Sequence, residues 1–199
     1  LITLVVVWNA SYAQTPEVNQ GEHRLGITYS SFGDNDVIRF QSLAGAASYN
    51  EDSFFSVGLN YLYAIQPGLY LETGLEYSAH SMTIFPNVPP GSEIEPYPTS
   101  LSLIGVPLTV RAVFWKYLFL NGGLLLDFQT ASDNELDSQT GIGGLLGLGL
   151  NYDFKFGGSV FVNPYLKAHA LVPFTNERYP QRLMETGIRM GITYAWNSQ

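Results

Sequence analysis

Glu76, Ser78 and His80 come closest in this sequence to the parts of a hydrolytic site. A hydroxyl, a histidine base and a carboxylate can together carry out acyl transfer. These three alternate along a predicted strand, so their side chains share one face. Residues two apart on a strand are separated by about 6.6 Å along it. We therefore expect no direct hydrogen bond within the set, and we interpret His80 as a structural residue of a polar interior.

No other constellation in the sequence specifies a reaction. The chain has no cysteine, and it lacks the spacings of a metal site, a phosphate-binding loop or a nucleophile elbow. We predict no catalytic residue, no cofactor and no metal site. The enzymatic alternative requires His80 to meet a hydroxyl and a carboxylate from neighbouring strands, and Asp127 or an acidic loop residue could supply the carboxylate.

The composition is unusual for a soluble globular protein. Only 13% of the 199 residues are charged, 14% are aromatic, and 20 are glycine, whereas soluble domains have about 25% charged residues. The formal charge of −8 and the lack of a basic cluster argue against a nucleic-acid partner. A membrane β-barrel explains both the scarcity of charge and the abundance of glycine and aromatic residues.

Polar and apolar residues alternate with a period of two in eight segments, which predicts eight β-strands. The predicted strands are 22–31, 53–65, 69–80, 101–115, 117–129, 140–154, 159–172 and 185–196. Long polar connections (32–52, 81–100, 131–139 and 173–181) alternate with very short turns. This asymmetry predicts an all-β fold, an eight-stranded antiparallel transmembrane up-and-down β-barrel with both termini on the periplasmic side.

The apolar face of each predicted strand carries essentially no ionised residue near its middle. A soluble lipocalin-like barrel would instead turn its apolar residues inward. A transmembrane helix over 101–128 is disfavoured by Arg111, Lys116, Pro107 and several glycines. We expect a β-bulge at Pro107, because a closed barrel has no free edge for a proline. Ala170 is expected on the lipid-facing side.

The opposite face collects five acids and five bases, which we interpret as a salt-bridge network that fills the lumen. The alternative, a narrow porin-like channel, would need a wider lumen or a ring of one charge sign. The predicted lumenal charges are Arg24, Glu72, Glu76, Arg111, Asp127, Asp153, Lys155, Lys167, Glu185 and Arg189.

The two ends of the chain carry predicted targeting signals. Residues 1–13 resemble the remnant of a signal peptide, with cleavage expected between Ala13 and Gln14, so that 14–199 form the barrel domain. Near the other end, Arg189, Gly191, Tyr194 and Trp196 have the spacing of the closing-strand signal that the barrel-insertion machinery reads.

Several glycine-rich and aromatic stretches are similar to the PorT-like family of small outer-membrane barrels, which is structurally akin to OmpX and the OmpA membrane domain. The stretches are Gly58-Leu59, Pro67-Gly68, 73–78, 104–108, Gly122-Gly123 and 187–196. The resemblance implies a barrel in the outer membrane of a Gram-negative cell. It does not imply one activity, because family members are mostly uncharacterised or are accessories of larger outer-membrane assemblies.

We therefore predict a non-enzymatic integral outer-membrane protein with a structural or interaction role, for example as a subunit of a larger complex. The alternatives are a small barrel enzyme acting on lipid A and a narrow porin-like channel. Expected partners are outer-membrane lipid, lipopolysaccharide, the insertion machinery and other outer-membrane proteins, through the loops or the leucine-rich wall of the fifth and sixth strands. Divalent cation binding by the acidic loops is a further hypothesis, although no calcium-loop spacing is present.

Overall fold

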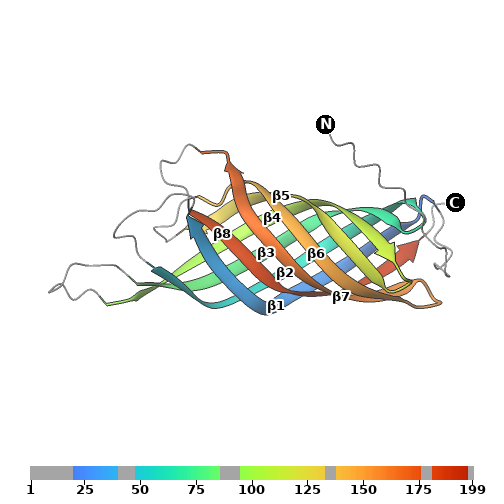
Figure 1. Ribbon diagram of the computed structural model, residues 1–199, viewed down its shortest axis with the longest axis horizontal. Helices are drawn as coiled ribbons and strands as arrows, with labels where there is room; N and C mark the ends of the chain where they lie inside the picture. Colours follow the sequence, from blue (N-terminus) through green and yellow to red (C-terminus); the bar gives the residue numbers. More distant parts are fainter. Residues whose placement is uncertain (1–19, 40–47, 86–94, 133–137, 176–180, 197–199) are drawn as a thin grey trace, which may run out of the picture.

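The protein is an eight-stranded closed β-barrel. The computed structural model describes residues 20–39, 48–85, 95–132, 138–175 and 181–196. Each strand pairs antiparallel with the next, and β8 pairs with β1 (Figure 1). The strands are β1 (His23–Arg39), β2 (Ser48–Gln66), β3 (Leu69–Phe85), β4 (Tyr97–Phe114), β5 (Leu118–Ser132), β6 (Gly141–Asp153), β7 (Gly158–Pro173) and β8 (Gln181–Trp196). The predicted fold class is confirmed.

Within the described residues, no helix is long and apolar enough to cross a membrane.

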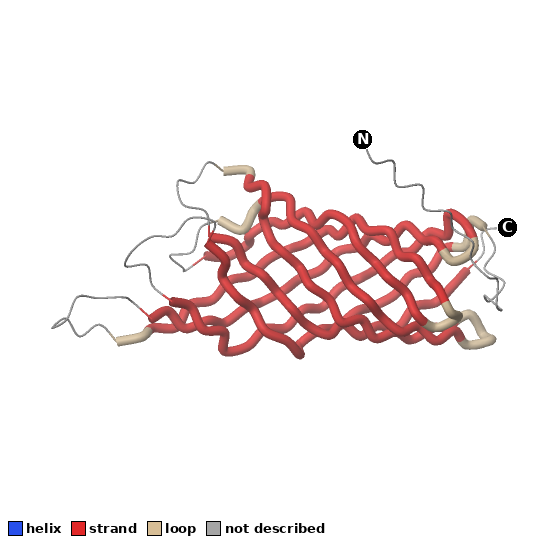
Figure 2. Tube along the Cα trace, in the orientation of Figure 1, coloured by secondary structure: helices blue, strands red, loops and turns tan. Residues whose placement is uncertain are grey.

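The two ends of the barrel differ in how the strands are joined. Short turns connect β2 to β3, β4 to β5 and β6 to β7 at one end, where β1 also begins and β8 ends (Figure 2). We call this the turn end. At the opposite end β1, β3, β5 and β7 end and β2, β4, β6 and β8 begin, and we call this the loop end (Figure 1).

The strands are longer at the loop end than the sequence predicts. β1 continues to Arg39, past the glycine and acids that predicted a loop from residue 32, and pairs with β8 down to Gln181. β3 reaches Phe85, and Pro98 of β4 pairs with Thr83, so the predicted loop 81–100 was wrong at both ends. The error has a physical cause. Turn-forming residues stay extended here because neighbouring strands supply their backbone partners.

Pro107 does not produce the predicted bulge. The pairing of β3 with β4 has the same register on both sides of it, from Thr73 opposite Leu108 to Glu76 opposite Gly105. Between those pairs the ladder is interrupted, because proline has no N–H to donate. The register shift on β4 lies instead between Ser102 and Leu103, in its pairing with β5.

Ala170 was predicted to face lipid, but it is fully buried. Its φ of 43° lies in the left-handed region, and the pairing of β6 with β7 shifts register between Ile142 and Gly144. The irregularity breaks the alternation of faces, so Leu171 and Val172 are both exposed beyond it. A period of two cannot anticipate such a shift.

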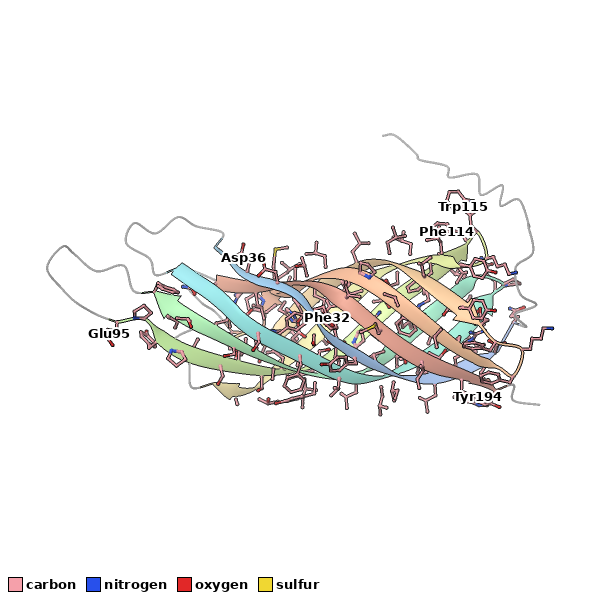
Figure 3. The ribbon with its side chains drawn as sticks, turned by 90° about the horizontal axis from the view of Figure 1, so that it is seen from below. Phe32, Asp36, Glu95, Phe114, Trp115 and Tyr194 are labelled. Atoms are coloured by element: carbon pink, nitrogen blue, oxygen red, sulfur yellow. The ribbon has the colours of Figure 1, made fainter. Side chains whose placement is uncertain are left out.

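The outer wall is apolar and carries aromatic side chains towards both ends. Tyr29, Val57, Tyr77, Ile104 and Phe128 are successive cross-strand partners and form one row over β1 to β5. Figure 3 places Phe114, Trp115 and Tyr194 at the turn end, and Asp36 and Glu95 at the loop end. Aromatic residues flanking an apolar band are typical of membrane barrels. The exposed apolar wall is therefore the surface that faces lipid.

Glycines on the inner wall make room for large side chains. An added Cβ at Gly149 would overlap the Phe119 ring, and one at Gly191 would lie 2.5 Å from ring carbons of Phe161. The two phenylalanines meet edge to face, with centroids 6.1 Å apart. The glycine-rich sequence of β6 thus permits an aromatic core inside a narrow barrel.

We expect Gly149→Ala to destabilise the barrel by about 1–3 kcal/mol, because overpacking forces the Phe119 ring to move. Gly144→Ala on the same strand is the matched control, since its new Cβ would have no neighbour closer than Leu171 Cδ1 at 3.8 Å. The effect is measured as the denaturant concentration at which half of the barrel is unfolded in lipid vesicles. Heat-modifiable gel migration reports the folded fraction. Equal midpoints for the two variants would contradict the packing argument.

Candidate functional site: the charge network in the lumen

Nine of the ten predicted lumenal charges lie on the inner wall, and eight of these are buried. Asp153, near the turn end, is the half-buried one. The prediction that Lys155 faces the lumen was wrong. Lys155 lies in the exposed turn between β6 and β7, because β6 ends at Asp153 and the alternation ends with it. The network also includes groups absent from the predicted set, among them Glu22, His80 and His169.

Arg24 organises the cluster nearest the turn end. Its Nε donates to Glu22 Oε1 at 2.6 Å, and its Nη1 donates to Asp153 Oδ1 at 2.5 Å. The guanidinium also lies 5.6 Å from the centre of the Tyr70 ring. Two carboxylates and an aromatic face thus enclose one cation. Glu22 was left out of the predicted set although it shares the inward parity of Arg24 in the predicted strand 22–31, which was a usable signal.

Arg111 and Glu72 form the central ion pair. Arg111 donates to the two carboxylate oxygens of Glu72 at 3.0 and 2.8 Å, a bidentate geometry. Its guanidinium carbon lies 4.2 Å from the Phe119 ring centre and 4.7 Å from that of Phe161. Arg189 adds a second cation, with Nη2 at 3.4 Å from Glu72 Oε1. One buried carboxylate therefore serves two arginines.

Lys167 links strands from opposite sides of the barrel. Its Nζ is hydrogen-bonded to Glu76 on β3 and lies 3.1 Å from Glu185 on β8. Tyr165 donates to Glu185 Oε1 at 2.5 Å and also bonds Ser30. The contact of Lys167 with Glu76 crosses the lumen from β7 to β3, so it fills the lumen as well as neutralising charge.

His80 and His169 lie near Glu185 on the side towards the loop end. His80 Nε2 is 3.1 Å from Ser78 Oγ and 3.5 Å from Glu185 Oε2, while His169 Nδ1 is 2.9 Å from Asp127 Oδ2. The expectation of no direct hydrogen bond within the set Glu76, Ser78 and His80 was wrong. The imidazole ring spans the distance along the strand that short side chains cannot.

A small apolar cluster lies beyond these histidines, towards the loop end. Met82, Leu101, Leu103 and Leu183 pack together, each 1% exposed. They come from β3, β4 and β8 and face the lumen. Sequence reasoning missed this cluster, although the inward parity of Leu101 and Leu103 was a usable signal. The cluster places apolar side chains in the lumen between the charged groups and the loop end.

The described part of the chain contains no group of three or more histidine, aspartate or glutamate side chains arranged to hold a metal ion. The acidic loop residues Glu93, Asp133, Glu135, Asp137 and Glu177 lie outside the described residues. The hypothesis of cation binding there stays a prediction.

The four residues of the predicted insertion signal lie on β8. Arg189 faces the lumen with Gly191, while Tyr194 and Trp196 face outward at the turn end. Trp196 stacks on His23 of β1, with ring centroids 5.7 Å apart. The recognition role of these residues stays a prediction.

The fold and the apolar wall define the class of protein as a small barrel of the outer-membrane type. The structure resembles outer membrane protein OprG from Pseudomonas aeruginosa, at 11% identity and a TM-score of 0.59, over 89% of this chain and 97% of OprG. It also resembles AlkL, an outer membrane protein solved in DMPC bilayers, at 11% identity and a TM-score of 0.56, over 94% and 95% of the chains. At this identity the likeness concerns the fold alone.

No protein-family model and no curated protein sequence matches the chain.

We expect Glu72→Gln to cost about 3–5 kcal/mol of stability, because it leaves Arg111 and Arg189 buried without their shared carboxylate. Glu95→Gln, at an exposed position near the loop end, is the control with the same chemical change. Denaturant midpoints of the folded barrels in lipid vesicles compare the two. If both variants unfold with the wild type, the ion pairs are not structural.

Proposed function

We propose that this protein is an integral outer-membrane barrel of a Gram-negative cell, with both termini in the periplasm, a closed lumen and a non-catalytic structural or interaction role. The observation that carries the proposal is the lumen. It is filled by ion pairs, some between neighbouring strands and one, Lys167 with Glu76, between strands on opposite sides of the ring. Towards the loop end it is covered by Met82, Leu101, Leu103 and Leu183.

The outer wall supports the location in a membrane. Leu59 is 56% exposed and Leu150 is 57% exposed, an arrangement that water would disfavour and lipid favours. Membrane barrels of bacteria have short periplasmic turns and longer external loops. The turn end therefore corresponds to the periplasmic side. The PorT-like resemblance is compatible with this location and stays a prediction.

The barrel width supports a closed lumen. An eight-stranded barrel has an interior just wide enough to be filled by side chains. Here Lys167 reaches carboxylates on β3 and β8, and the Arg111 guanidinium lies against two phenylalanine rings that contact each other edge to face. A conducting path would have to pass two layers of buried groups, one around Arg111 and one around Lys167, and then the apolar cluster of Met82, Leu101, Leu103 and Leu183. Each layer would need several buried groups to separate.

The geometry around His80 supports a non-catalytic role. In a catalytic triad the serine and the acid contact opposite ring nitrogens, so that the acid orients the base. Here Ser78 and Glu185 both lie near Nε2 of His80. His80 is 2% exposed and Ser78 is 4% exposed, and both face the lumen, so a lipid substrate outside the barrel has no access to them.

With conduction through the lumen and catalysis at His80 disfavoured, we propose an interaction role for the outer wall. Leu120, Leu124, Leu146, Leu148 and Leu150 make the outer wall of β5 and β6 a continuous leucine surface. We propose outer-membrane lipid and other outer-membrane proteins as partners of the outer wall. Lipopolysaccharide and the barrel-insertion machinery are the other proposed partners.

Purified protein in planar lipid bilayers should show no stable single-channel steps of porin size, because the lumen is closed by packed ion pairs. A large general porin recorded under the same conditions provides the positive control. Stable steps that appear with folded protein and disappear after its heat denaturation would overturn the closed-lumen proposal.

Cells producing the wild-type protein and cells producing His80→Gln should have identical lipid A mass spectra. The buried position of His80 offers no route for hydrolysis. Equal amounts of heat-modifiable barrel in the two strains must be shown first. Loss of an acyl chain from lipid A in the wild-type strain alone would instead establish the enzymatic alternative.

A further inference from the structure

Two of the three lysines of this acidic protein lie in neighbouring turns at the turn end. Lys116 lies between β4 and β5, and Lys155 lies between β6 and β7. Both are exposed, whereas the third lysine, Lys167, is buried in the lumen. The turn end therefore concentrates accessible positive charge that the rest of the composition does not suggest.

The two lysines line a common pocket of about 400 Å³. Tyr117 and Tyr152 form another part of its lining, with their rings stacked at an interplanar angle of 8° and centroids 6.0 Å apart. Small-ligand sites have volumes of about 300–1,000 Å³. The pocket thus combines two cations with a flat aromatic surface at the rim of the apolar wall.

The backbone holds the first turn in an unusual conformation. Trp115 has a φ of 49° and Lys116 a φ of 67°, in the left-handed region that favours glycine over bulky residues. Trp115 is 80% exposed and projects from the barrel (Figure 3). Positive φ angles are common in tight β-hairpin turns, and this turn holds a tryptophan and a lysine at the membrane rim.

Asp153 also lines the pocket, but its charge is compensated from the lumen. Its Oδ1 accepts a hydrogen bond from Arg24 at 2.5 Å, and its Oδ2 accepts one from Asn151 at 3.0 Å. The two lysines are therefore the charges of the lining that point to an external ligand, and that ligand must be an anion.

An apolar groove adjoins the pocket, and its apolar lining favours an anion that carries an acyl chain. The groove has a volume of about 460 Å³ and is lined on the outer wall by Leu25, Ile27, Phe156, Val160 and Ile192. Phe154 lines both the groove and the lysine pocket. A free phosphate would use only the pocket, whereas a lipid would occupy the pocket with its headgroup and the groove with an acyl chain.

We propose that this rim is a binding site for an anionic glycerophospholipid, with its phosphate between Lys116 and Lys155 and one acyl chain in the groove below Phe154. The site rests on the proposed membrane location, and it specifies a lipid class and a leaflet for that location. The lipid belongs to the leaflet at the turn end.

Lipid preference can be measured on the purified full-length barrel in phosphatidylcholine bicelles titrated with phosphatidylglycerol, with bound lipid counted by native mass spectrometry. Each lysine near an anionic headgroup should strengthen binding by about five-fold. Lys116→Gln with Lys155→Gln should therefore remove most of the preference for phosphatidylglycerol. Lys116→Arg with Lys155→Arg should retain it.

Heat-modifiable migration establishes that both double variants are folded. Glu95→Gln at the loop end, which changes the net charge by one unit in the opposite direction, shows whether net charge far from the site alters lipid preference. Unchanged phosphatidylglycerol preference in the double glutamine variant would overturn the proposal. Equal occupancy by glycerol phosphate alone would also overturn it, because the acyl groove would then contribute nothing. Cell fractionation tests the membrane location separately, so failure of the lipid site and failure of the proposed location give different results.

Discussion

Closure of β8 on β1 is the constraint on which the rest of this structure depends. Hydrocarbon offers no hydrogen-bonding partner to a backbone N–H or C=O, so every strand must be paired on both sides. The two terminal strands pair from His23 opposite Trp196 to Arg39 opposite Gln181, with one register shift near Ser31. This long pairing removes the only two edges that the sheet would have. It explains why β1 stays extended through a glycine and acids that elsewhere would form a loop.

A closed ring of eight strands fixes the width of the lumen, and the width decides how charge is accommodated inside. Glu72 and Arg111 cannot be solvated by bulk water there, so each must find its counter-charge on a neighbouring strand. The Arg111 guanidinium of this bidentate pair lies against Phe119 and Phe161, which fit because β6 and β8 present glycines. The pairing of charges, the aromatic packing and the glycines of the inner wall therefore all follow from the narrow width of the lumen.

With the lumen occupied, the surfaces open to partners are the outer wall and the two ends. The outer wall presents leucines and aromatic rings, and the turn end adds Lys116 and Lys155 around stacked tyrosines. These surfaces are the basis of the proposed contacts with lipid and other membrane proteins. The buried set of Ser78, His80 and Glu185 has the residue types of a hydrolase, but Ser78 and Glu185 lie near the same ring nitrogen of His80, whereas a catalytic triad places the serine and the acid on opposite nitrogens.

The alternation of apolar and polar residues by itself determined the class of fold, the number of strands and the face of the side chains where the strands are regular, because period-two geometry is local. Only the tertiary structure decided where the strands end, which charges pair, and that Lys155 lies in a turn. It also decided that Ala170 turns inward at a register shift and that His80 reaches Ser78. These features depend on neighbouring strands, whose register and shifts are set by closure of the whole ring and not by any one segment.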